Sequence, residues 1–214
     1  MPRVRFRLSS VEATEVDERL ADLFASDPRR LAPHLHAPLQ SGSDRVLRRM
    51  GRHWYTSASY ASAVERLLAG RAPFALGGDV IAGFPGETDA DHAATLSLVR
   101  SLPFTYLHVF PYSARPGTAA TRLGGDVAPS VVAARARELR AAGAALAGEH
   151  RSRRVGESCD LVVTGAGPGR AGVTEDYLDV TVEGDAPRGT RCAARLAGDA
   201  TRLLATPVAT TFPA

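Results

Sequence analysis

The sequence contains no lysine, so its 26 cationic side chains other than histidine are all arginine. The planar guanidinium suits phosphate groups and stacked bases, which favours a nucleic-acid partner. The alternative is compositional, because a chain rich in alanine, glycine and arginine is typical of a GC-rich genome. With 23 acidic residues the net charge is only +3, so charge alone does not identify a partner.

Cysteine is also scarce. The two cysteines, Cys159 and Cys192, lie far apart in the sequence and in no CxxC-type spacing. This argues against a disulfide scaffold and against a self-contained zinc or iron–sulfur site. We interpret both thiols as packing residues.

Long hydrophobic runs are absent, since no apolar stretch approaches the roughly 18 residues that span a bilayer. The first residues, 1–6, mix charged and apolar side chains and do not resemble a signal peptide. We therefore expect a cytoplasmic protein without a membrane partner. A chain of 214 residues is long enough for one large domain, or for one domain with a small appendage.

Residues 1–150 alternate strand-like and helix-like patterns. Strands are predicted at 4–8, 35–39, 74–84 and 106–110, with helix starts at Thr14-x-x-Asp17 and Thr88-x-x-Asp91 and a long helix over 129–150. Because residues 74–84 are almost continuously apolar, that strand is predicted to be buried on both faces. Four such units indicate parallel βα structure and are too few to close a barrel of eight, so we expect part of a barrel or an open α/β sheet.

The composition changes near Arg151. Short β-type runs at 159–163, 177–182, 190–195 and 203–208 are separated by glycines, which predicts a small all-β barrel of OB-like size over residues 151–214. This segment holds eight arginines and eight acidic residues and is therefore neutral. Any contact with nucleic acid there must come from local arrangement, because a generic phosphate-binding domain is basic.

Polar loops follow three of the predicted strands, at residues 40–44, 83–88 and 112–118. The carboxyl ends of parallel strands meet at one edge, where α/β proteins bind their ligands. Glycines and serines after strands also serve simply as turn formers. Three such loops in order are harder to explain as turns, so we expect a ligand-binding rim.

Five ordered segments together resemble the bacterial radical-SAM tRNA methylthiotransferases. They are RLSSVE (7–12), HLHAPLQSGSD (34–44), MGRHWYT (50–56), DVIAGFPGET (79–88) and HVFPYSARPGT (108–118). The branch that they resemble modifies N6-threonylcarbamoyladenosine in tRNA, and residues 172–177 (GVTEDY) resemble its C-terminal TRAM domain. The resemblance extends over essentially the whole chain.

The resemblance implies the C-terminal part of a radical-SAM (β/α) barrel (1–150) and a TRAM-like β-barrel (151–214). The family adds a methylthio group to C2 of the adenine, using S-adenosyl-L-methionine and two [4Fe-4S] clusters held by two cysteine triads. Neither triad, including the CxxxCxxC segment, occurs in this sequence, and such clusters require thiolate ligands. The isolated chain is therefore expected to be inactive, and a missing N-terminal half on another polypeptide is a candidate partner.

The resemblance also implies site residues. The residues expected to face S-adenosylmethionine are Gln40, Ser41, Gly42, Ser43, Arg52, Asp79, Ile81, Gly83, Phe110, Tyr112 and Ser113. Those expected to contact tRNA are Arg115, Thr118, Arg151, Arg153 and Arg154. Arg52 would bind the methionine carboxylate, or would be a solvated arginine at a helix end. Gly78 departs from the family pattern, where a threonine is expected.

Two features leave alternatives open. His34 and His36 share one face of a predicted strand, which is metal-ligand geometry, but the sequence offers no third ligand at a suitable spacing. Glu87 is a candidate acid/base group, or simply favours the following helix N-terminus. The alternative functions are a catalytically dead tRNA-binding fragment and a stand-alone α/β metal-dependent hydrolase using these three residues.

Overall fold

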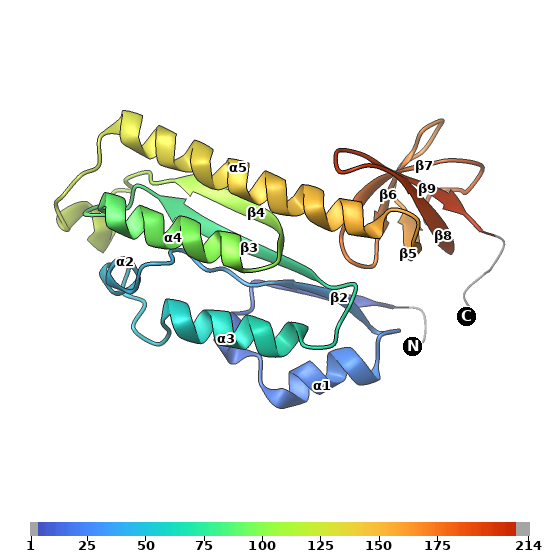
Figure 1. Cartoon of the computed structure of the whole chain (residues 1–214), viewed down its shortest axis with the longest axis horizontal. Helices are drawn as coiled ribbons and strands as arrows, with labels where there is room; N and C mark the ends of the chain where they lie inside the picture. Colours follow the sequence, from blue (N-terminus) through green and yellow to red (C-terminus); the bar gives the residue numbers. More distant parts are fainter. Residues whose placement is uncertain (1–3, 209–214) are drawn as a thin grey trace.

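A computed structural model describes residues 4–208 as a parallel sheet with helices, followed by a closed β-barrel (Figure 1). The first part contains β1 (Phe6–Ser9), α1 (Glu18–Ser26), β2 (Leu31–His36), α2 (Asp44–Arg49), α3 (Ser57–Leu68), β3 (Ala75–Ala82), α4 (Asp89–Ser101), β4 (Phe104–Pro111) and α5 (Pro129–Arg154). Short 3-10 helices occupy Ala13–Glu15 and Ala119–Arg122. The barrel contains β5 (Ser158–Val163), β6 (Ala171–Thr174), β7 (Asp179–Val182), β8 (Arg191–Gly198) and β9 (Leu203–Pro207).

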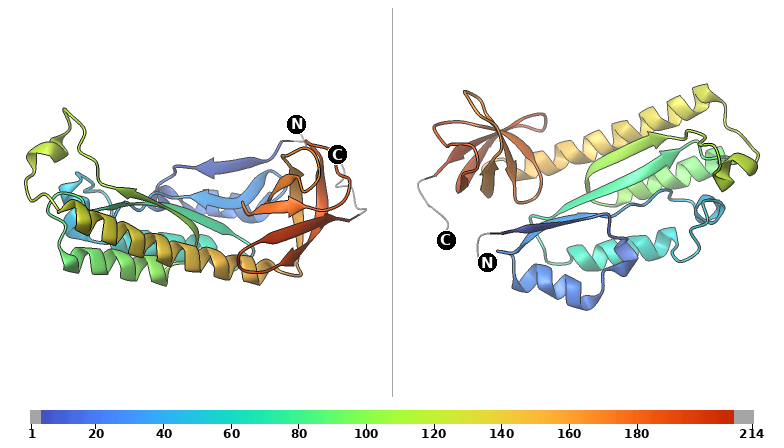
Figure 2. Two further views of the ribbon diagram at one scale, coloured as in Figure 1. Left: turned by 90° about the horizontal axis from the view of Figure 1, so that it is seen from above. Right: turned by 180° about the vertical axis from the view of Figure 1, so that it is seen from behind.

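The four strands of the sheet lie in the order β1-β2-β3-β4, and all neighbouring pairs are parallel. Helices α3, α4 and α5 run along one face of this sheet (Figures 1 and 2). Strand–helix alternation in the sequence predicted this parallel arrangement, and the prediction is confirmed. The order follows the sequence, as expected when each short crossover returns beside the strand it left.

Side-chain caps fix where the helices begin. The Asp17 carboxylate accepts a hydrogen bond from the Leu20 amide at 2.8 Å, so α1 begins after Asp17. The sequence placed this start one turn earlier, at Thr14, where the chain instead forms a 3-10 turn. Thr88 and Asp91 form the predicted reciprocal capping box at the start of α4.

The second strand was predicted too late in the sequence. The structure has β2 at Leu31–His36, whereas the apolar pattern suggested 35–39. Residues beyond His36 remain buried, and the amides of Ala37 and Leu39 donate to carbonyls of β3. Periodicity did not separate the strand from this packed extension, because both are apolar and hydrogen-bonded to the same neighbour.

The two faces of the sheet differ in chemistry. The helix-covered face holds the apolar core, including the fully buried Leu35, Leu76 and Val80. The opposite face carries imidazole, carboxylate and phenol groups, contributed by His34, His36, Asp79, Tyr106 and His108.

Two glycines in β3 make room for aromatic rings of β4. A Cβ on Gly77 would lie 2.0 Å from the Tyr106 ring, and one on Gly78 would lie 2.6 Å from the Phe104 ring. Any side chain at these positions would therefore displace a ring. This packing explains why Gly78 replaces the threonine that the family resemblance led us to expect.

The barrel closes in the order β5-β6-β7-β9-β8 around an apolar core that includes Leu161, Leu196 and Leu203. Four of its strands overlap the β-type runs predicted from sequence. The sequence missed β6, whose central Gly172 follows a cluster of turn-forming glycines. A Cβ there would meet Leu161 at 2.6 Å, so this glycine serves close strand packing and not a turn.

The long helix α5 leads from the sheet directly into the barrel. The predicted division after residue 150 falls inside this helix, which ends at Arg154, and that two-domain division remains a prediction. The barrel lies near the start of the sheet strands (Figure 1). There Arg5 forms an ion pair with Asp160 at 2.5 Å, and the ring of Tyr177 lies 4.7 Å from that of His34. No helix among residues 4–208 is both long enough and apolar enough to cross a membrane.

Candidate functional site

A cavity of about 350 Å³ lies at the carboxyl ends of β3 and β4. Its lining residues are Gln40, Asp79, Ile81, Phe84, Phe110, Pro111, Tyr112, Ser113, Arg115, Thr118 and Ala120. Six of the predicted cofactor residues are among them, as are the predicted RNA-contacting residues Arg115 and Thr118. The fold therefore brings residues from all three predicted loops to one place, which we call the rim cavity.

Backbone hydrogen bonds hold the loops of the rim cavity together. Gln40, in the segment after β2, has a left-handed backbone (φ 68°). The Ile81 amide of β3 donates a hydrogen bond to the Gln40 carbonyl at 2.9 Å. On the other side, the Tyr112 amide donates to the Ala82 carbonyl at 2.8 Å. The chain segments after β2 and β4 are thus both attached to the end of β3.

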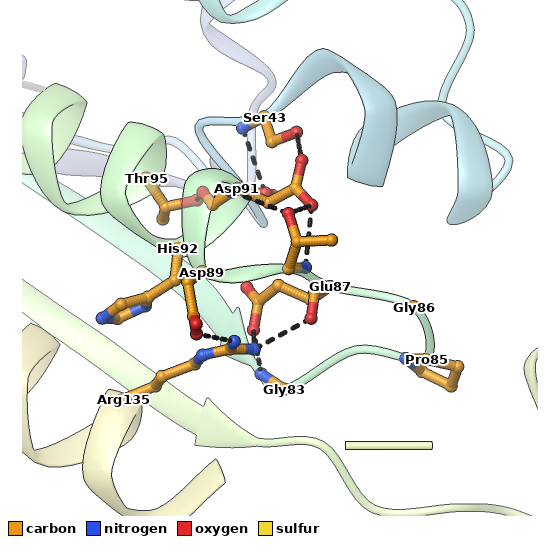
Figure 3. Close-up of polar contacts among 12 residues, drawn as sticks. Ser43, Gly83, Pro85, Gly86, Glu87, Asp89, Asp91, His92, Thr95 and Arg135 are labelled. Carbon is orange, nitrogen blue, oxygen red and sulfur yellow. Dashed lines mark hydrogen bonds and ion pairs between the residues drawn. The ribbon is translucent and has the colours of Figure 1, made fainter. Parts of the chain in front are cut away.

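Ser41, Gly42 and Ser43, which the sequence predicted to face S-adenosylmethionine, are not among the residues that line this cavity. The Ser41 hydroxyl is buried 3.2 Å from that of Thr95, and Ser43 donates to the carboxylate of Asp91 at 2.6 Å (Figure 3). A Cβ on Gly42 would overlap the backbone of α4. Their polar groups connect the start of α2 to α4, so they hold the loop after β2 in place beside the rim cavity.

The loop after β3 is likewise structural. Gly83 has a positive φ of 76°, and its amide donates to the buried carboxylate of Glu87 at 2.7 Å (Figure 3). A Cβ on Gly83 would lie 2.4 Å from Val132 of α5, so Gly83 faces the helix and not the cavity. Arg135 of α5 pairs with Glu87 at 2.9 Å. Glu87 therefore ties the loop to α5, and this ion pair opposes the alternative of a general acid/base group there.

Arg52 lies outside the cavity lining. Its guanidinium pairs with the carboxylate of Glu12 at 2.9 Å and lies 5.7 Å from the ring of Trp54. The indole of Trp54 donates to the same carboxylate. A ligand carboxylate at Arg52 would have to displace Glu12, so the predicted contact with methionine stays a prediction that this ion pair opposes.

The three arginines at the junction have different environments. Arg154 is only 3% exposed and pairs with Glu157, Glu175 and Asp176, so its predicted contact with RNA phosphate stays a prediction that this burial opposes. Its charge is used to hold α5 to the barrel. Arg153 is exposed, and Arg151 donates to the Ala200 carbonyl at 2.5 Å at the edge of a shallow depression. These two remain candidate phosphate contacts.

Both cysteines lie in the barrel core, on the neighbouring strands β5 and β8. Burial raises the pKa of the Cys159 thiol to about 12 and raises that of Cys192 as well. Two buried, protonated thiols do not fit a [4Fe-4S] cluster, which is held by several thiolates.

Sequence reasoning missed one group of residues. Asp79 Oδ1 lies 3.0 Å from His36 Nε2 and 3.1 Å from His108 Nδ1, on three adjacent strands of the open face. His34, the other histidine of the predicted pair, instead contacts the Tyr106 hydroxyl at 2.8 Å. Spacing along the chain could not reveal this group, because strand pairing brings its members together.

The rim cavity thus combines aromatic rings, hydrogen-bonding groups and one arginine in a space that suits part of a nucleoside-like ligand. Phe110 is half-exposed at its wall, and the Tyr112 ring packs edge-on against Phe84 at 5.4 Å. Residue types of this kind bind planar bases by stacking and fix them by a few polar contacts.

Comparison with known proteins identifies related chains. This chain is 45% identical over 126 residues to the threonylcarbamoyladenosine tRNA methylthiotransferase MtaB of Thermotoga maritima, covering 59% of this chain and 29% of that one. It is 41% identical over 189 residues to a tRNA-2-methylthio-N(6)-dimethylallyladenosine synthase of Coxiella burnetii, covering 86% and 42%. An Anaeromyxobacter enzyme with the latter description is 39% identical, covering 90% and 44%.

The fold has a counterpart among solved structures. Coproporphyrinogen III oxidase (HemN) from Escherichia coli, described as a radical SAM enzyme, matches with a TM-score of 0.53 at 16% identity, covering 90% of this chain and 46% of that one. No family model matches the chain. The chain spans less than half the length of these curated relatives. Over that span it is a homologue of the radical-SAM tRNA methylthiotransferases, as its sequence motifs indicated.

Proposed function

We propose that this chain forms the cofactor- and substrate-facing wall of an enzyme that adds a methylthio group to C2 of N6-threonylcarbamoyladenosine in tRNA. The observation that carries the proposal is the rim cavity, where three strand-end loops converge on a space lined by Asp79, Phe110 and Tyr112. Homology to tRNA methylthiotransferases supports the reaction class. The fold shared with a radical SAM enzyme supports this type of scaffold.

The lining of the rim cavity fits S-adenosylmethionine in chemistry. Phe110 and Tyr112 offer rings for the adenine, while Gln40, Asp79 and Ser113 offer hydrogen-bonding groups for the ribose and amino-acid portions. When bound, this cofactor supplies the 5′-deoxyadenosyl group that removes the C2 hydrogen. The residues of this chain bind and orient the cofactor; the cluster ligands are not among them.

The polar lining favours the threonylcarbamoyl branch. A threonylcarbamoyl group carries a carboxylate and a hydroxyl, whereas a dimethylallyl group is entirely apolar. Arg115 and Thr118 at the wall provide a cation and a hydroxyl that suit the first group. Neither group would gain a hydrogen-bonding partner from the second.

The closed barrel is proposed to be the TRAM-like tRNA-binding part. Its size, its five strands and the exposed Arg153 at its junction with α5 support this role. Since the segment is neutral overall, contact with tRNA would depend on local cations and not on the general field.

Calorimetric titration of the purified chain with S-adenosylmethionine tests the cofactor assignment. Replacing Phe110 by Ala should weaken binding, because the ring lines the cavity. Phe6→Ala is the matched control, since Phe6 is similarly exposed on β1, outside the lining of the rim cavity. Absence of binding, or equal effects of the two substitutions, would count against the proposed site.

Binding of anticodon stem-loops tests the branch. The RNA should be compared with N6-threonylcarbamoyl- or N6-dimethylallyladenosine at the target position. The chain should prefer the threonylcarbamoyl RNA, and Arg115→Gln should reduce that preference. Arg122→Gln, a nearby exposed arginine, is the control. Equal affinity for both RNAs would overturn the branch assignment while leaving the reaction class intact.

A catalytically inactive tRNA-binding protein is the second candidate function. It is favoured by one observation, that the two cysteines are buried and burial raises the pKa of the Cys159 thiol, which opposes binding of a cluster. This candidate predicts salt-dependent binding of tRNA by the chain without binding of S-adenosylmethionine. The calorimetric titration above therefore separates the two candidates.

A further inference from the structure

We propose that His36, Asp79 and His108 form a binding site for a divalent first-row transition-metal ion. The three residues come from the neighbouring strands β2, β3 and β4 and lie on the face of the sheet away from the helices. The site shares Asp79 with the rim cavity, but binding of the ion requires neither S-adenosylmethionine nor tRNA.

The distances suit ligands of a single ion. Asp79 Oδ1 lies 3.0 Å from His36 Nε2 and 3.1 Å from His108 Nδ1, and the three ligand atoms all lie within 4.8 Å of one another. Ligand atoms about 2.1 Å from a tetrahedral ion are separated by about 3.4 Å, slightly more than these two contacts. Small side-chain rotations would bring both nitrogens onto one ion beside the carboxylate.

His36 provides a second, independent observation. Its Nε2 is buried and makes no hydrogen bond of acceptable geometry among residues 4–208, although the Asp79 carboxylate is so close. A buried nitrogen without a partner carries a free-energy cost. An ion bound between the nitrogen and the carboxylate would coordinate both groups. The poorly aligned contact between them gives the nitrogen no such partner.

Strand pairing explains how the site is built. Asp79 lies directly opposite His108 in the β3–β4 register, and His36 lies opposite Gly77, two residues before Asp79. In a strand, residues two apart face the same side. All three side chains therefore project from one face, with Tyr106 packed beside both histidines.

His34 does not belong to this site. Its Nε2 lies 2.8 Å from the Tyr106 hydroxyl, and its ring lies 4.7 Å from that of Tyr177 of the barrel. Of the two histidines of β2, His34 therefore contacts the barrel, and His36 is the proposed metal ligand.

The donor set selects the class of ion. Two imidazoles and one carboxylate suit Zn²⁺, Fe²⁺ or Co²⁺, whereas Mg²⁺ and Ca²⁺ prefer oxygen ligands. Without a thiolate the site differs from that of an iron–sulfur cluster. Three protein ligands leave at least one coordination position open. Because Asp79 also lines the rim cavity, an open position would be available to water or to an oxygen of a ligand bound there.

Equilibrium dialysis of the untagged, EDTA-treated chain against Zn²⁺, followed by elemental analysis, tests the proposal. We expect one equivalent of zinc, and Co²⁺ should give visible absorption from the same site. Asp79→Asn and His108→Gln should each weaken binding about tenfold or more, since even losing a group that supports a ligand costs about 10–100-fold. His108 is half-exposed, so its variant should remain folded.

The control is His53→Gln, which removes an exposed imidazole outside the cluster. Its zinc affinity should equal that of the parent chain, and circular dichroism should show that all variants keep the native fold. Less than stoichiometric zinc at micromolar free metal would overturn the proposal. Zinc binding unchanged in the Asp79→Asn/His108→Gln double variant would do so as well, because the ion would then bind elsewhere.

Discussion

Arg135 of α5 donates to the buried carboxylate of Glu87 at 2.9 Å, and only 7% and 1% of these side chains are exposed. The same guanidinium donates to the Glu87 carbonyl at 3.1 Å and to the exposed carboxylate of Asp89 at 2.6 Å. Glu87 in turn accepts from the Gly83 amide. One arginine therefore joins the last helix of the sheet layer to the loop at the rim.

Arg135→Ala should destabilise the chain by about 3–5 kcal/mol, because the charge of Glu87 would remain buried without its partner. Urea unfolding followed by circular dichroism measures the change. Arg137→Ala, two residues away on the exposed side of α5, should change stability by less than about 0.5 kcal/mol. Similar losses in the two variants would mean that the ion pair does not anchor the loop.

The ionised carboxylate of Asp91 makes the stability of the fold depend on pH. Burial alone would raise the pKa of this carboxyl, but hydrogen bonds from Arg45, Ser43 and Thr88 outweigh it and hold the pKa below its ordinary value. The stabilisation is therefore complete above the unfolded pKa of about 4 and is lost as pH falls from there through the folded value.

Asp91→Asn should consequently be less stable than the parent chain at pH 7, and the difference should narrow as pH falls below about 4. Unfolding midpoints in urea, measured across this range, provide the comparison. The control is Asp126→Asn, which removes the same charge at an exposed position. A difference that stays constant with pH would show that the hydrogen bonds do not favour the ionised carboxyl.

The parallel sheet and the rim could be predicted because their signals are local. A buried strand such as β3 is apolar along its length, and loops such as Tyr112–Thr118 follow strand ends wherever the strands lie in space. Parallel strands bring those ends to one edge, so loop order in the sequence sufficed to predict convergence on the rim cavity.

Direction and pairing of side chains could not be predicted in the same way. Ser43 was predicted to face the cofactor and Arg154 to contact RNA, yet each is paired with a buried carboxylate. The group formed by His36, Asp79 and His108 depends on the register between three strands. Such tertiary pairings cannot be predicted from the spacing of residues along the chain.

Packing against Phe104 is expected to disfavour at position 78 the threonine that the family pattern has there. Gly78→Thr places a Cβ 2.6 Å from the Phe104 ring, so we expect a loss of about 1–3 kcal/mol from overpacking. Thermal or urea unfolding measures it. Gly148→Ala on α5 is the control, because its nearest neighbour would lie at an ordinary 3.6 Å, and a helical alanine is favourable. An unchanged stability in Gly78→Thr would show that the ring can move aside.

The buried cysteines predict how the chain reacts with thiol reagents and iron. With its pKa raised to about 12 by burial, the Cys159 thiol stays protonated at pH 8, and only the thiolate is reactive or binds metal. Ellman's reagent should therefore label the native chain slowly and the urea-unfolded chain rapidly. An exposed cysteine introduced by Ser152→Cys should react at once in the native state.

Because the thiol stays protonated, anaerobic reconstitution with iron and sulfide should leave the native chain without a stoichiometric cluster. Cluster absorption that disappears in Cys159→Ala would contradict the assignment of this thiol to packing.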